Sequence, residues 1–579
     1  MPLPKEIQCR VEPWLHPPYD QETQTAVKQL IDHDPAQLVD AFGSIISFGT
    51  GGMRGLMGVG TNRLNSYTIR NATQGLALYL LQQASDPSVF ISYDSRRHSA
   101  LFAQETACVL AGNGIRVFLT PSLRPTPFVS FGCRYHNCTA AVMITASHNP
   151  PNYNGYKVYW SDGAQVVFPH DQGIMREVAT ITSPTQVKCA NPNSPLITEV
   201  TSATDDAYFQ SMLSLQNFPE TNRRDGHTLH IVYSPLHGTG MTTLPKALNQ
   251  WGFSSLSIVQ AQATPDPLFT NAPSPNPETS EALQLGIDQL VREKGDLFLA
   301  SDPDADRLAV VVQKNGVAIP FNGNQVASIC LYFLCSTLLE QGKMPVNGAF
   351  VTTIVTTELL QAIARAFQKP CFQVLTGFKY IGEKIRLWET DPEGYQFIFG
   401  AEESLGYLYG TQVRDKDATV AACLIAEIAL RQKKEGKTLF DFLEMIYQKF
   451  GLFKEKQRSI PLQSTDKESA ATRMAYLRDH LPREIAEEPI TLVQDYFTRK
   501  EIDYALNIEK PLYLPPSNVL SFRLASGSKY VIRPSGTEPK IKIYGMVRFR
   551  SPPSLLEGLN RCNMQLDRQL QWLCDHYFS

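Results

Sequence analysis

Short apolar runs that each end in a polar turn recur along this sequence, and they limit its fold more than any other feature. Segments with helical periodicity lie between them. Continuous apolar strands that alternate with helices are typical of α/β layers with mostly parallel sheets. Ligands of such sheets bind beyond the C-terminal strand ends, so polar motifs at those ends are the first candidates for function. The runs are 89–94, 140–145, 230–235, 296–301, 348–355 and 396–400.

The length and the pattern of the last part indicate several domains. A chain of 579 residues is too long for one ordinary domain, and the length favours about three to five. From Val519 onward, apolar and polar residues alternate, which predicts a largely antiparallel, half-exposed sheet in a different fourth domain. We interpret residues 183–204, rich in Pro, Asn, Ser and Thr, as a surface loop. The expected domains are 1–215, 216–320, 321–450 and 451–579.

Charge and composition exclude several classes of protein. The formal net charge is −3, which gives no support for a general binder of nucleic acid or of an anionic membrane. No run approaches the roughly 18 apolar residues that a membrane helix needs, and the first residues lack the apolar core of a secretory signal. The eleven cysteines are scattered without a C-x-x-C pair, so we expect reduced thiols in a cytoplasmic protein rather than a metal site.

A first motif follows the strand predicted at 140–145, where Ser147 precedes His148, Asn149 and two prolines. Proline fixes φ and prevents a helix from continuing, so the serine lies on a rigid turn. A hydroxyl held at a strand end can serve as a nucleophile or carry a phosphate. An ordinary serine turn is the alternative that the local sequence leaves open.

A second motif holds three carboxylates at alternate positions directly after another apolar run. In an extended segment, Asp302, Asp304 and Asp306 project to one side and repel one another. A hard divalent cation, above all Mg²⁺, removes that repulsion, whereas a solvated acidic turn is the competing interpretation. Arg307, the next residue, would meet a phosphate oxygen or pair with an aspartate.

Three further motifs have weaker signals. Glu402, Glu403 and Ser404 follow the last apolar run and could bind sugar hydroxyls. The alternative is that the two glutamates begin a helix, where acidic residues interact favourably with the helix dipole. Residues 533–540 combine an arginine with hydroxyls and a glycine, as in a nest for an anion or in a plain hairpin turn. The glycine-rich segment 48–55 contains Arg54 but lacks the Lys-Ser/Thr ending of a nucleotide-binding P-loop.

Together these motifs, in this order, resemble the α-D-phosphohexomutase superfamily of phosphoglucomutases and phosphomannomutases, over nearly the whole chain. The contexts 147–157 and 413–417 look like the larger phosphoglucomutase/phosphopentomutase branch. The resemblance implies three related α/β domains, with mixed, mostly parallel sheets, and a smaller α+β C-terminal domain around a central cleft. Where the compact bacterial branch usually has Met and His, this chain has Glu403 and Tyr407, so glucose is the expected sugar rather than mannose.

The resemblance also assigns roles to residues. Ser147 is the expected phosphoserine, and its phosphate joins Asp302, Asp304 and Asp306 around one Mg²⁺ per active site. Arg54, Lys157 and His148 act at the reacting end, with Lys157 the first choice for general acid/base and His148 the second. We expect a lowered basicity of Lys157 beside an arginine and the metal. The expected substrate-binding residues are Arg307, Lys379, Glu402, Ser404, Arg414, Arg533, Ser535, Gly536 and Thr537.

The reaction implied is the interconversion of glucose 1-phosphate and glucose 6-phosphate through a phosphoserine enzyme and glucose 1,6-bisphosphate, which also serves as activator. The partners are sugar phosphates, with no nucleic acid or membrane, and the protein is a monomer or a dimer. The alternatives within this fold are a phosphopentomutase acting on ribose or deoxyribose phosphates, a phosphomannomutase and a bisphosphate synthase. A catalytically silent, mutase-like binding protein and a metal-dependent phosphatase are alternatives from other classes.

Overall fold

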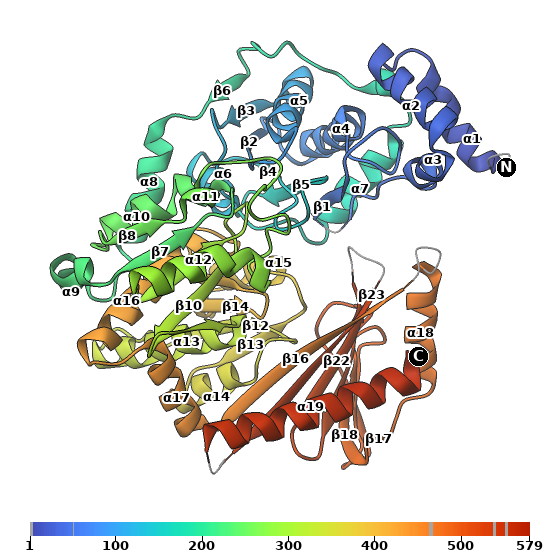
Figure 1. The fold of residues 1–579 in the computed structure, drawn as a ribbon. Helices are drawn as coiled ribbons and strands as arrows, with labels where there is room; N and C mark the ends of the chain where they lie inside the picture. Colours follow the sequence, from blue (N-terminus) through green and yellow to red (C-terminus); the bar gives the residue numbers. More distant parts are fainter. Residues whose placement is uncertain (1–3, 50, 463–466, 536–539, 551–553, 579) are drawn as a thin grey trace. The chain divides into compact units, whose positions relative to one another are not determined.

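The computed structural model divides into two compact units, each formed by segments that are discontinuous in the sequence (Figure 1). Unit 1 comprises residues 1–322, 378–397 and 404–436, and unit 2 comprises 323–377, 398–403 and 437–579. The structure describes residues 4–49, 51–462, 467–535, 540–550 and 554–578. Among these residues, no helix is long and apolar enough to cross a membrane.

The first sheet of unit 1 has six strands in the order β1-β5-β4-β2-β3-β6. Strands β4, β2, β3 and β6 run parallel, and β5 and β1 add an antiparallel edge. Alternate residues of the central strands share one buried core with covering helices, and all residues of Ala140–Ile144 are buried, as expected for strands covered on both faces. The strands are Gly52–Leu56 (β1), Ser88–Tyr93 (β2), Arg116–Leu119 (β3), Ala140–Ile144 (β4), Tyr153–Trp160 (β5) and Ile197–Glu199 (β6), and the helices are Ser66–Gln83 (α4), Ser99–Gly112 (α5), Thr126–Tyr135 (α6) and His170–Thr180 (α7).

The segment 183–204 is not only a surface loop, which corrects the interpretation made from its composition. It contains β6, which extends the sheet by parallel pairing of residues 197–199 with 117–119 of β3. An edge strand is held by main-chain hydrogen bonds and needs no apolar pattern, so composition gave no sign of it.

The second sheet of unit 1 has five strands in the order β11-β10-β9-β7-β8. Strand β7 pairs in parallel with β8 and β9, and β10 and β11 continue as antiparallel hairpins. The elements are Ile231–Ser234 (β7), Leu256–Ile258 (β8), Leu297–Ser301 (β9), Leu308–Lys314 (β10), Val317–Phe321 (β11), Ser202–Leu213 (α8), Pro219–Asp225 (α9), Leu244–Gln250 (α10), Gln260–Ala263 (α11) and Ser280–Glu293 (α12).

Two further parts of unit 1 complete it. Helices α1 (Lys5–Val11), α2 (Gln21–His33) and α3 (Pro35–Phe42) build a small core of their own around Trp14 and Phe42. Helix α15 (Lys379–Thr390), strand β15 (Gly406–Tyr409) and helix α16 (Ala418–Lys434) belong to the same unit although they come later in the sequence. A bridge between Arg307 and Gly406 ties the start of β15 to the segment after β9.

Unit 2 begins with a third α/β part, in which β12 pairs in parallel with β13. Its elements are Gly323–Glu340 (α13), Gly348–Thr353 (β12), Leu359–Ala366 (α14), Cys371–Val374 (β13), Gln396–Glu402 (β14, in this unit from Ile398) and Leu439–Phe450 (α17). Helix α13 is buried nearly all round, which explains its continuous apolar sequence.

The C-terminal part of unit 2 is an antiparallel sheet in the order β16-β23-β22-β21-β18-β19-β20, with β17 paired to β18. Helices α18 and α19 contribute to the core of this sheet through Met474, Leu570 and neighbouring side chains. The bounds are Leu452–Pro461 (β16), Lys467–Asp479 (α18), Glu484–Ile485 (β17), Glu488–Asp495 (β18), Lys500–Asp503 (β19), Ile508–Pro511 (β20), Leu520–Leu524 (β21), Lys529–Pro534 (β22), Lys540–Phe549 (β23) and Leu555–Tyr577 (α19). The alternation from Val519 onward therefore predicted the antiparallel strands β21–β23 correctly, but these strands are mostly buried rather than half-exposed, and the alternation did not cover β16–β20.

Candidate active site

Ser147 lies in a tight loop that follows β4 in unit 1. Its backbone adopts the left-handed region, with φ at 51°, and its side chain is buried. The Ser147 Oγ donates a hydrogen bond to Asp302 Oδ2 at 2.7 Å and lies 3.2 Å from His148 Nδ1. The Ser147 N–H is bonded to Thr145 Oγ1 at 2.8 Å. The predicted serine is therefore fixed by its surroundings rather than placed on a free surface turn.

The three predicted aspartates follow β9 and are all buried. One carboxylate oxygen from each of Asp302, Asp304 and Asp306 lies within 4.8 Å of the others. Buried Oδ1 atoms of Asp304 and Asp306 have no hydrogen-bond partner among the described residues. Burying a carboxylate oxygen without a hydrogen-bond partner costs free energy, and a bound cation removes that cost. Because Mg²⁺ prefers carboxylate oxygens as ligands, this cluster fits such a cation.

The pKa values of this cluster follow from burial and from neighbouring charges. Burial, together with the charges of Asp304 and Asp306, raises the pKa of Asp302 well above its ordinary value. Burial also acts to raise the pKa of Asp304, but the charge and hydrogen bond of Lys157, together with hydrogen bonds from Asp302 and Thr126, outweigh it and the pKa is lowered. The ammonium group of Lys157 thus already compensates part of the negative charge.

Lys157 and Arg54 come from neighbouring antiparallel strands. Arg54 of β1 stands opposite Gly155 of β5, two residues before Lys157, so both side chains project from one face of the sheet. Lys157 Nζ lies 2.8 Å from Asp304 Oδ2 and 3.3 Å from Asp306 Oδ2. Arg54 Nη1 donates to Asn149 Oδ1 at 3.0 Å. The structure therefore brings both predicted cations to the loops that carry the serine and the aspartates.

The pKa values of Lys157 and His148 are shifted in opposite directions. Burial acts to lower the pKa of Lys157, but the charges of Asp304 and Asp306 outweigh it and the pKa is raised. The lowered basicity expected from sequence concerns Lys157 beside Mg²⁺ and stays a prediction. Burial and the charges of Arg307 and Arg54 lower the pKa of His148 well below its ordinary value. His148 is accordingly a neutral imidazole near pH 7 in this environment.

The remaining predicted residues of unit 1 have varied surroundings. Arg307 Nη1 lies 3.5 Å from Glu278 Oε1, and its Nε lies 4.0 Å from Asp306 Oδ1. Lys379 begins α15, where its Nζ lies 5.0 Å from the Tyr380 ring centroid and burial lowers its pKa. Arg414 is buried, pairs with Glu389 and donates to the Thr411 carbonyl, so its described contacts are structural.

The other predicted binding residues lie at the ends of β14 and β22. Glu402 ends β14 and is buried, and Ser404 follows two residues later. In unit 2, Arg533 Nε donates to the Pro534 carbonyl at 3.4 Å, and the Ser535 N–H donates to the Lys540 carbonyl at 2.8 Å. Gly536 and Thr537 lie outside the described residues.

Several residues around the serine and the aspartates escaped sequence reasoning. Thr126 Oγ1 donates to Asp304 Oδ2, and its N–H donates to the Asp304 carbonyl, both at 2.9 Å. Lys416 Nζ lies 3.3 Å from Asp306 Oδ2 and 3.1 Å from Asp415 Oδ1. Arg96 contacts the backbone of the serine loop. The only sequence signals were the rigid Pro-Thr-Pro run around Thr126 and the charged segment 413–417.

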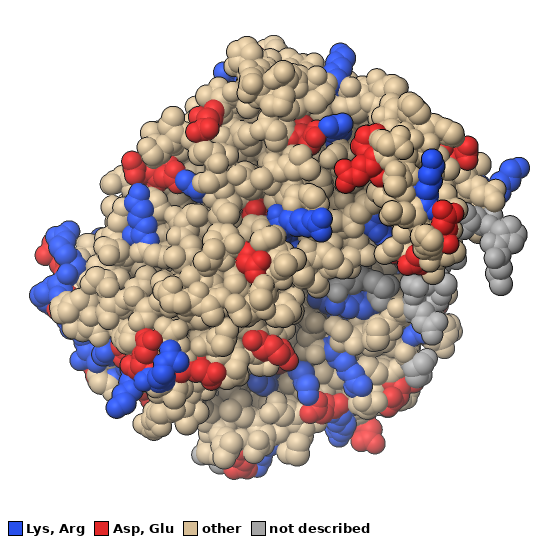
Figure 2. All heavy atoms as spheres, turned by 45° about the horizontal axis from the view of Figure 1, so that its top comes forward, with Lys and Arg blue, Asp and Glu red and all other residues tan. Residues whose placement is uncertain are grey.

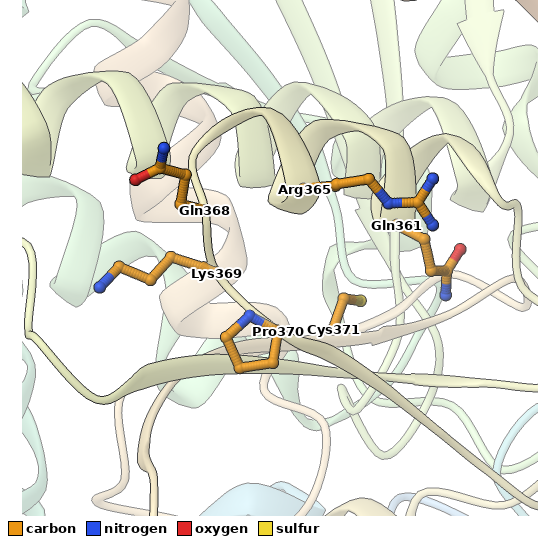
Figure 3. Close-up of a pocket in the computed structure, with 6 residues that line it drawn as sticks. All are labelled: Gln361, Arg365, Gln368, Lys369, Pro370 and Cys371. Atoms are coloured by element: carbon orange, nitrogen blue, oxygen red, sulfur yellow. The ribbon is translucent and has the colours of Figure 1, made fainter.

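A hollow in unit 2 lies between the end of α14 and the start of β13 (Figure 3). Its volume is about 240 Å³, and Arg365 and Lys369 are among its lining residues. Lys369 Nζ donates to the carbonyls of Pro345 and Val346 at 2.6 and 2.8 Å. This lysine therefore holds the segment before β12.

The site combines a buried hydroxyl, a carboxylate cluster that fits Mg²⁺, and neighbouring lysine and arginine side chains. Enzymes that transfer phosphoryl groups use this combination of groups. Three consecutive family profiles match the chain, described as phosphoglucomutase/phosphomannomutase α/β/α domains I, II and III, over residues 46–185, 206–316 and 322–450. The chain belongs to this phosphoglucomutase/phosphomannomutase family of the α-D-phosphohexomutase superfamily, which confirms the resemblance seen in the sequence.

Curated relatives agree with this membership. The chain is 35% identical over 526 residues to a phosphoglucomutase of Staphylococcus aureus, covering 90% of this chain and 93% of that one. It is 34% identical over 533 residues to a phosphoglucomutase of Staphylococcus haemolyticus, covering 91% and 92%.

Two solved structures share the fold. One is a phosphoglucomutase/phosphomannomutase family protein from Burkholderia thailandensis, with a TM-score of 0.62, 17% identity and coverage of 90% and 97%. The other is parafusin, a phosphoglucomutase from Paramecium, with a TM-score of 0.65, 17% identity and coverage of 90% and 94%. The predicted fold, three α/β domains with mixed sheets and a sheet-rich C-terminal domain, is confirmed.

Proposed function

We propose that the protein is a phosphoglucomutase, which interconverts glucose 1-phosphate and glucose 6-phosphate through a phosphoserine at Ser147. The observation that carries this proposal is the 2.7 Å hydrogen bond from Ser147 Oγ to Asp302 Oδ2, within the buried aspartate cluster. A phosphate on this oxygen would lie beside the cation that the cluster fits. The phosphoglucomutases to which the chain is 34–35% identical support the choice of sugar.

In the proposed reaction, the bond between phosphorus and Ser147 Oγ breaks while a bond forms to the 6-hydroxyl oxygen of glucose 1-phosphate. The 6-hydroxyl proton passes to a base, the released Ser147 oxygen takes up a proton, and glucose 1,6-bisphosphate results. After the sugar has turned over, its 1-phosphate returns to Ser147, whose hydroxyl proton passes to a base while the freed 1-oxygen of the sugar is protonated, and glucose 6-phosphate is left. Bound by Asp302, Asp304, Asp306 and the serine phosphate, Mg²⁺ would neutralise charge on the transferring group.

The side chains near Ser147 have distinct proposed roles in this transfer. Arg54 and Lys157 stabilise negative charge on the moving phosphoryl group, since both project toward the serine and aspartate loops. Lys157 and His148 both remain candidates for the proton transfer. His148 Nδ1 lies within 3.2 Å of the serine oxygen, while Lys157 is held by two carboxylates.

The substrate is held at its other groups by the loops that sequence singled out. We propose that Glu402 and Ser404 bind sugar hydroxyls and that Arg307, Lys379 and Arg414 support phosphate binding. The phosphate that is not being transferred is assigned to Arg533, Ser535, Gly536 and Thr537. These roles accompany four domains at 1–215, 216–320, 321–450 and 451–579, each of which supplies one of the loops.

The proposal extends to the cofactor and the setting of the enzyme. Glucose 1,6-bisphosphate acts as both intermediate and activator, and sugar phosphates are the only partners proposed, with the protein a monomer or a dimer. Lysine, arginine, aspartate and glutamate are intermingled on the face drawn in Figure 2, without one broad basic surface there. A cytoplasmic location is supported by the eleven cysteines, which are free thiols.

A panel of sugar phosphates tests the substrate. Glucose, mannose, ribose and deoxyribose 1-phosphates would be compared by kcat/KM in the presence of Mg²⁺ and the matching bisphosphate. The expected result is a preference for glucose 1-phosphate. A preference for the pentose phosphates would make the enzyme a phosphopentomutase, and steady release of inorganic phosphate would make it a phosphatase.

Replacement of the serine tests the covalent intermediate. Ser147→Ala should lose all mutase activity and should no longer gain the mass of one phosphate on incubation with glucose 1,6-bisphosphate, because the acceptor oxygen is gone. Ser254→Ala, at an exposed position just before β8, is the matched control and should behave as wild type. Full activity of Ser147→Ala, measured by conversion of glucose 1-phosphate, would remove the phosphoserine assignment.

A further inference from the structure

Arg96 is a buried arginine whose contacts are concentrated on the loop that carries Ser147. It follows β2 and is 3% exposed. Its Nη1 donates to the carbonyls of Pro150 and Tyr153 at 2.8 and 3.1 Å. Its Nη2 donates to the carbonyls of Asn149, at 2.5 Å, and of Ser147 itself. The four N–H groups of its two terminal nitrogens are thus all directed to backbone oxygens of one short segment.

The position of Arg96 is itself fixed from the other side. Its Nε lies 3.2 Å from Asp94 Oδ2, and both side chains are fully buried. Asp94 Oδ1 accepts hydrogen bonds from Ser99 Oγ at 2.7 Å and from the Arg96 N–H at 3.0 Å. The Phe269 ring covers the guanidinium at 4.9 Å from its centroid. A buried ion pair with this many hydrogen bonds holds one geometry, and removal of either partner leaves a buried charge unpaired.

The loop needs such a support. Ser147 has a φ of 51°, a conformation that costs free energy for a residue with a side chain. The start of the loop also lies close against β5, since a Cβ on Gly155 would lie 2.3 Å from the Thr145 carbonyl oxygen and the Thr145 N–H donates to the Gly155 carbonyl at 3.1 Å. The carbonyls that Arg96 binds begin at the strained residue and continue to Tyr153, the first residue of β5.

We propose that Arg96, anchored by Asp94, is the positioning residue that holds the Ser147 hydroxyl in the orientation required for phosphoryl transfer. It touches the backbone of the serine loop rather than substrate, so it acts through Ser147. Phosphoryl transfer depends on alignment, and a misplacement of about 1 Å can cost about 100-fold in rate. Lysine cannot replace this arginine, because its ammonium has three N–H donors at one point instead of a planar fork. The inference rests on the proposed function.

The test compares Arg96→Lys with Arg97→Lys, a change at the exposed neighbouring arginine. Single-turnover transfer of phosphate from glucose 1,6-bisphosphate to Ser147 would be followed by intact mass, well below the thermal midpoint of each variant. Arg96→Lys should slow the transfer about 100-fold while KM for glucose 1-phosphate changes little. Asp94→Asn, which keeps the size of the anchor, should slow it by a smaller factor. Arg97→Lys should match wild type in both measurements.

Hydrogen exchange gives a readout that does not depend on activity. Amides of residues 145–153 should exchange faster in Arg96→Lys, while those of β9 stay protected, because only the serine loop loses its support. Wild-type transfer rates and exchange in both Arg96→Lys and Asp94→Asn would overturn the inference. An equal rise of exchange across unit 1 would also overturn it, since it would show a general structural role. If the wild-type protein does not become phosphorylated on Ser147, the proposed function is contradicted. The hydrogen-exchange comparison would still test whether Arg96 supports the serine loop.

Discussion

At the scale of single residues, the carboxylate of Asp304 shows how a cation site can be prepared by its neighbours. Its Oδ2 accepts from Thr126 Oγ1 at 2.9 Å and from Lys157 Nζ at 2.8 Å. The Oδ1 of the same group has no hydrogen-bond partner among the described residues. The two bonds therefore fix the orientation of the carboxylate and leave one oxygen to face the other aspartates. Such outer contacts commonly tune metal affinity.

Thr126→Val should weaken Mg²⁺ binding about tenfold, because the carboxylate of Asp304 loses one of the bonds that orient it. Valine keeps the shape of the fully buried threonine, so the fold should persist. The measurement is the Mg²⁺ concentration that supports half-maximal activity, together with direct titration by calorimetry. Thr120→Val is the control, since Thr120 is equally buried and bonds Ser92 Oγ rather than an aspartate. Equal Mg²⁺ affinity in both variants would contradict the assigned role.

Residues differ in how far sequence could reveal them. Ser147 and the three aspartates were found because their chemistry is local, in a hydroxyl before two prolines or in three acids at alternate positions. Arg96 and Thr126 were missed because each acts on a segment distant in the sequence, and partly through backbone atoms that no residue type encodes. The pKa of Lys157 is equally non-local, since it depends on the distances from its Nζ to Asp304 and Asp306.

At the scale of elements, β22 carries a buried lysine between two parts of unit 2. Lys529 is 2% exposed, and its Nζ donates to the Ile354 carbonyl, just after β12, at 2.9 Å. The ion pair of Arg523 with Glu358 joins the same two parts of this unit. Burial lowers the pKa of Lys529 to about 8, although Glu358 acts in the opposite direction. A group of this kind makes the packing of the strand depend on pH.

The pH dependence has a definite sign. Between pH 8 and the ordinary lysine value of 10.5, the unfolded chain holds a proton that the folded chain has released. The free energy of unfolding therefore rises with pH across this window, and the cost of charging Lys529 is fully present below about pH 8. A difference of this size corresponds to about 3 kcal/mol. Lys529→Met should remove it, so the variant should gain most relative to wild type at pH 7 and progressively less toward pH 10.5.

Urea unfolding of both proteins at several pH values from 7 to 10.5 measures this difference, and the titration of other groups cancels in the comparison. Lys510→Met, at an exposed position of β20, should give a difference from wild type that does not change with pH. If the difference in unfolding free energy between Lys529→Met and wild type also stayed constant with pH, burial of the Lys529 ammonium would carry no free-energy cost.

Elements themselves were predicted unevenly. Strands β2, β4, β7, β9 and β12 were visible as apolar runs because both faces of their sheets are covered. Strand β6 was hidden because an edge strand of three residues, one of them half-buried and two exposed, depends on backbone pairing alone. The alternation in β21 to β23 was readable because one face of the antiparallel sheet packs on α18 and α19.

At the scale of the whole molecule, the division into two units separates the aspartate cluster from the C-terminal sheet. Asp302, Asp304 and Asp306 belong to unit 1, which has its own core around the first sheet. Unit 2 has an independent core that includes Leu570 of α19. The sequence predicted the α/β order and the distinct last domain, but not this grouping, because 378–397 and 404–436 join unit 1 through tertiary contacts.

Mg²⁺ should therefore stabilise unit 1 selectively. A ligand at 100 times its Kd raises the free energy of unfolding by about 2.7 kcal/mol, so the thermal transition of unit 1 should move up by several degrees and return when a chelator is added. Asp306→Asn should lose this shift because one of the three ligands is gone, whereas Asp288→Asn, on the exposed side of α12, should keep it. Scanning calorimetry with and without Mg²⁺ measures both.

A core substitution in unit 2 identifies which thermal transition belongs to that unit. Leu570→Ala removes a side chain that is 2% exposed from the core of the C-terminal sheet, at a cost of about 2–5 kcal/mol, and should lower the transition of unit 2. In this variant, Mg²⁺ should raise the other transition and leave the lowered one in place, because the three aspartates proposed to bind the cation all belong to unit 1. The contrary outcome is that Mg²⁺ raises the same transition that Leu570→Ala lowers. The two units would then unfold in one cooperative transition, and cation binding at the aspartates would stabilise both units equally.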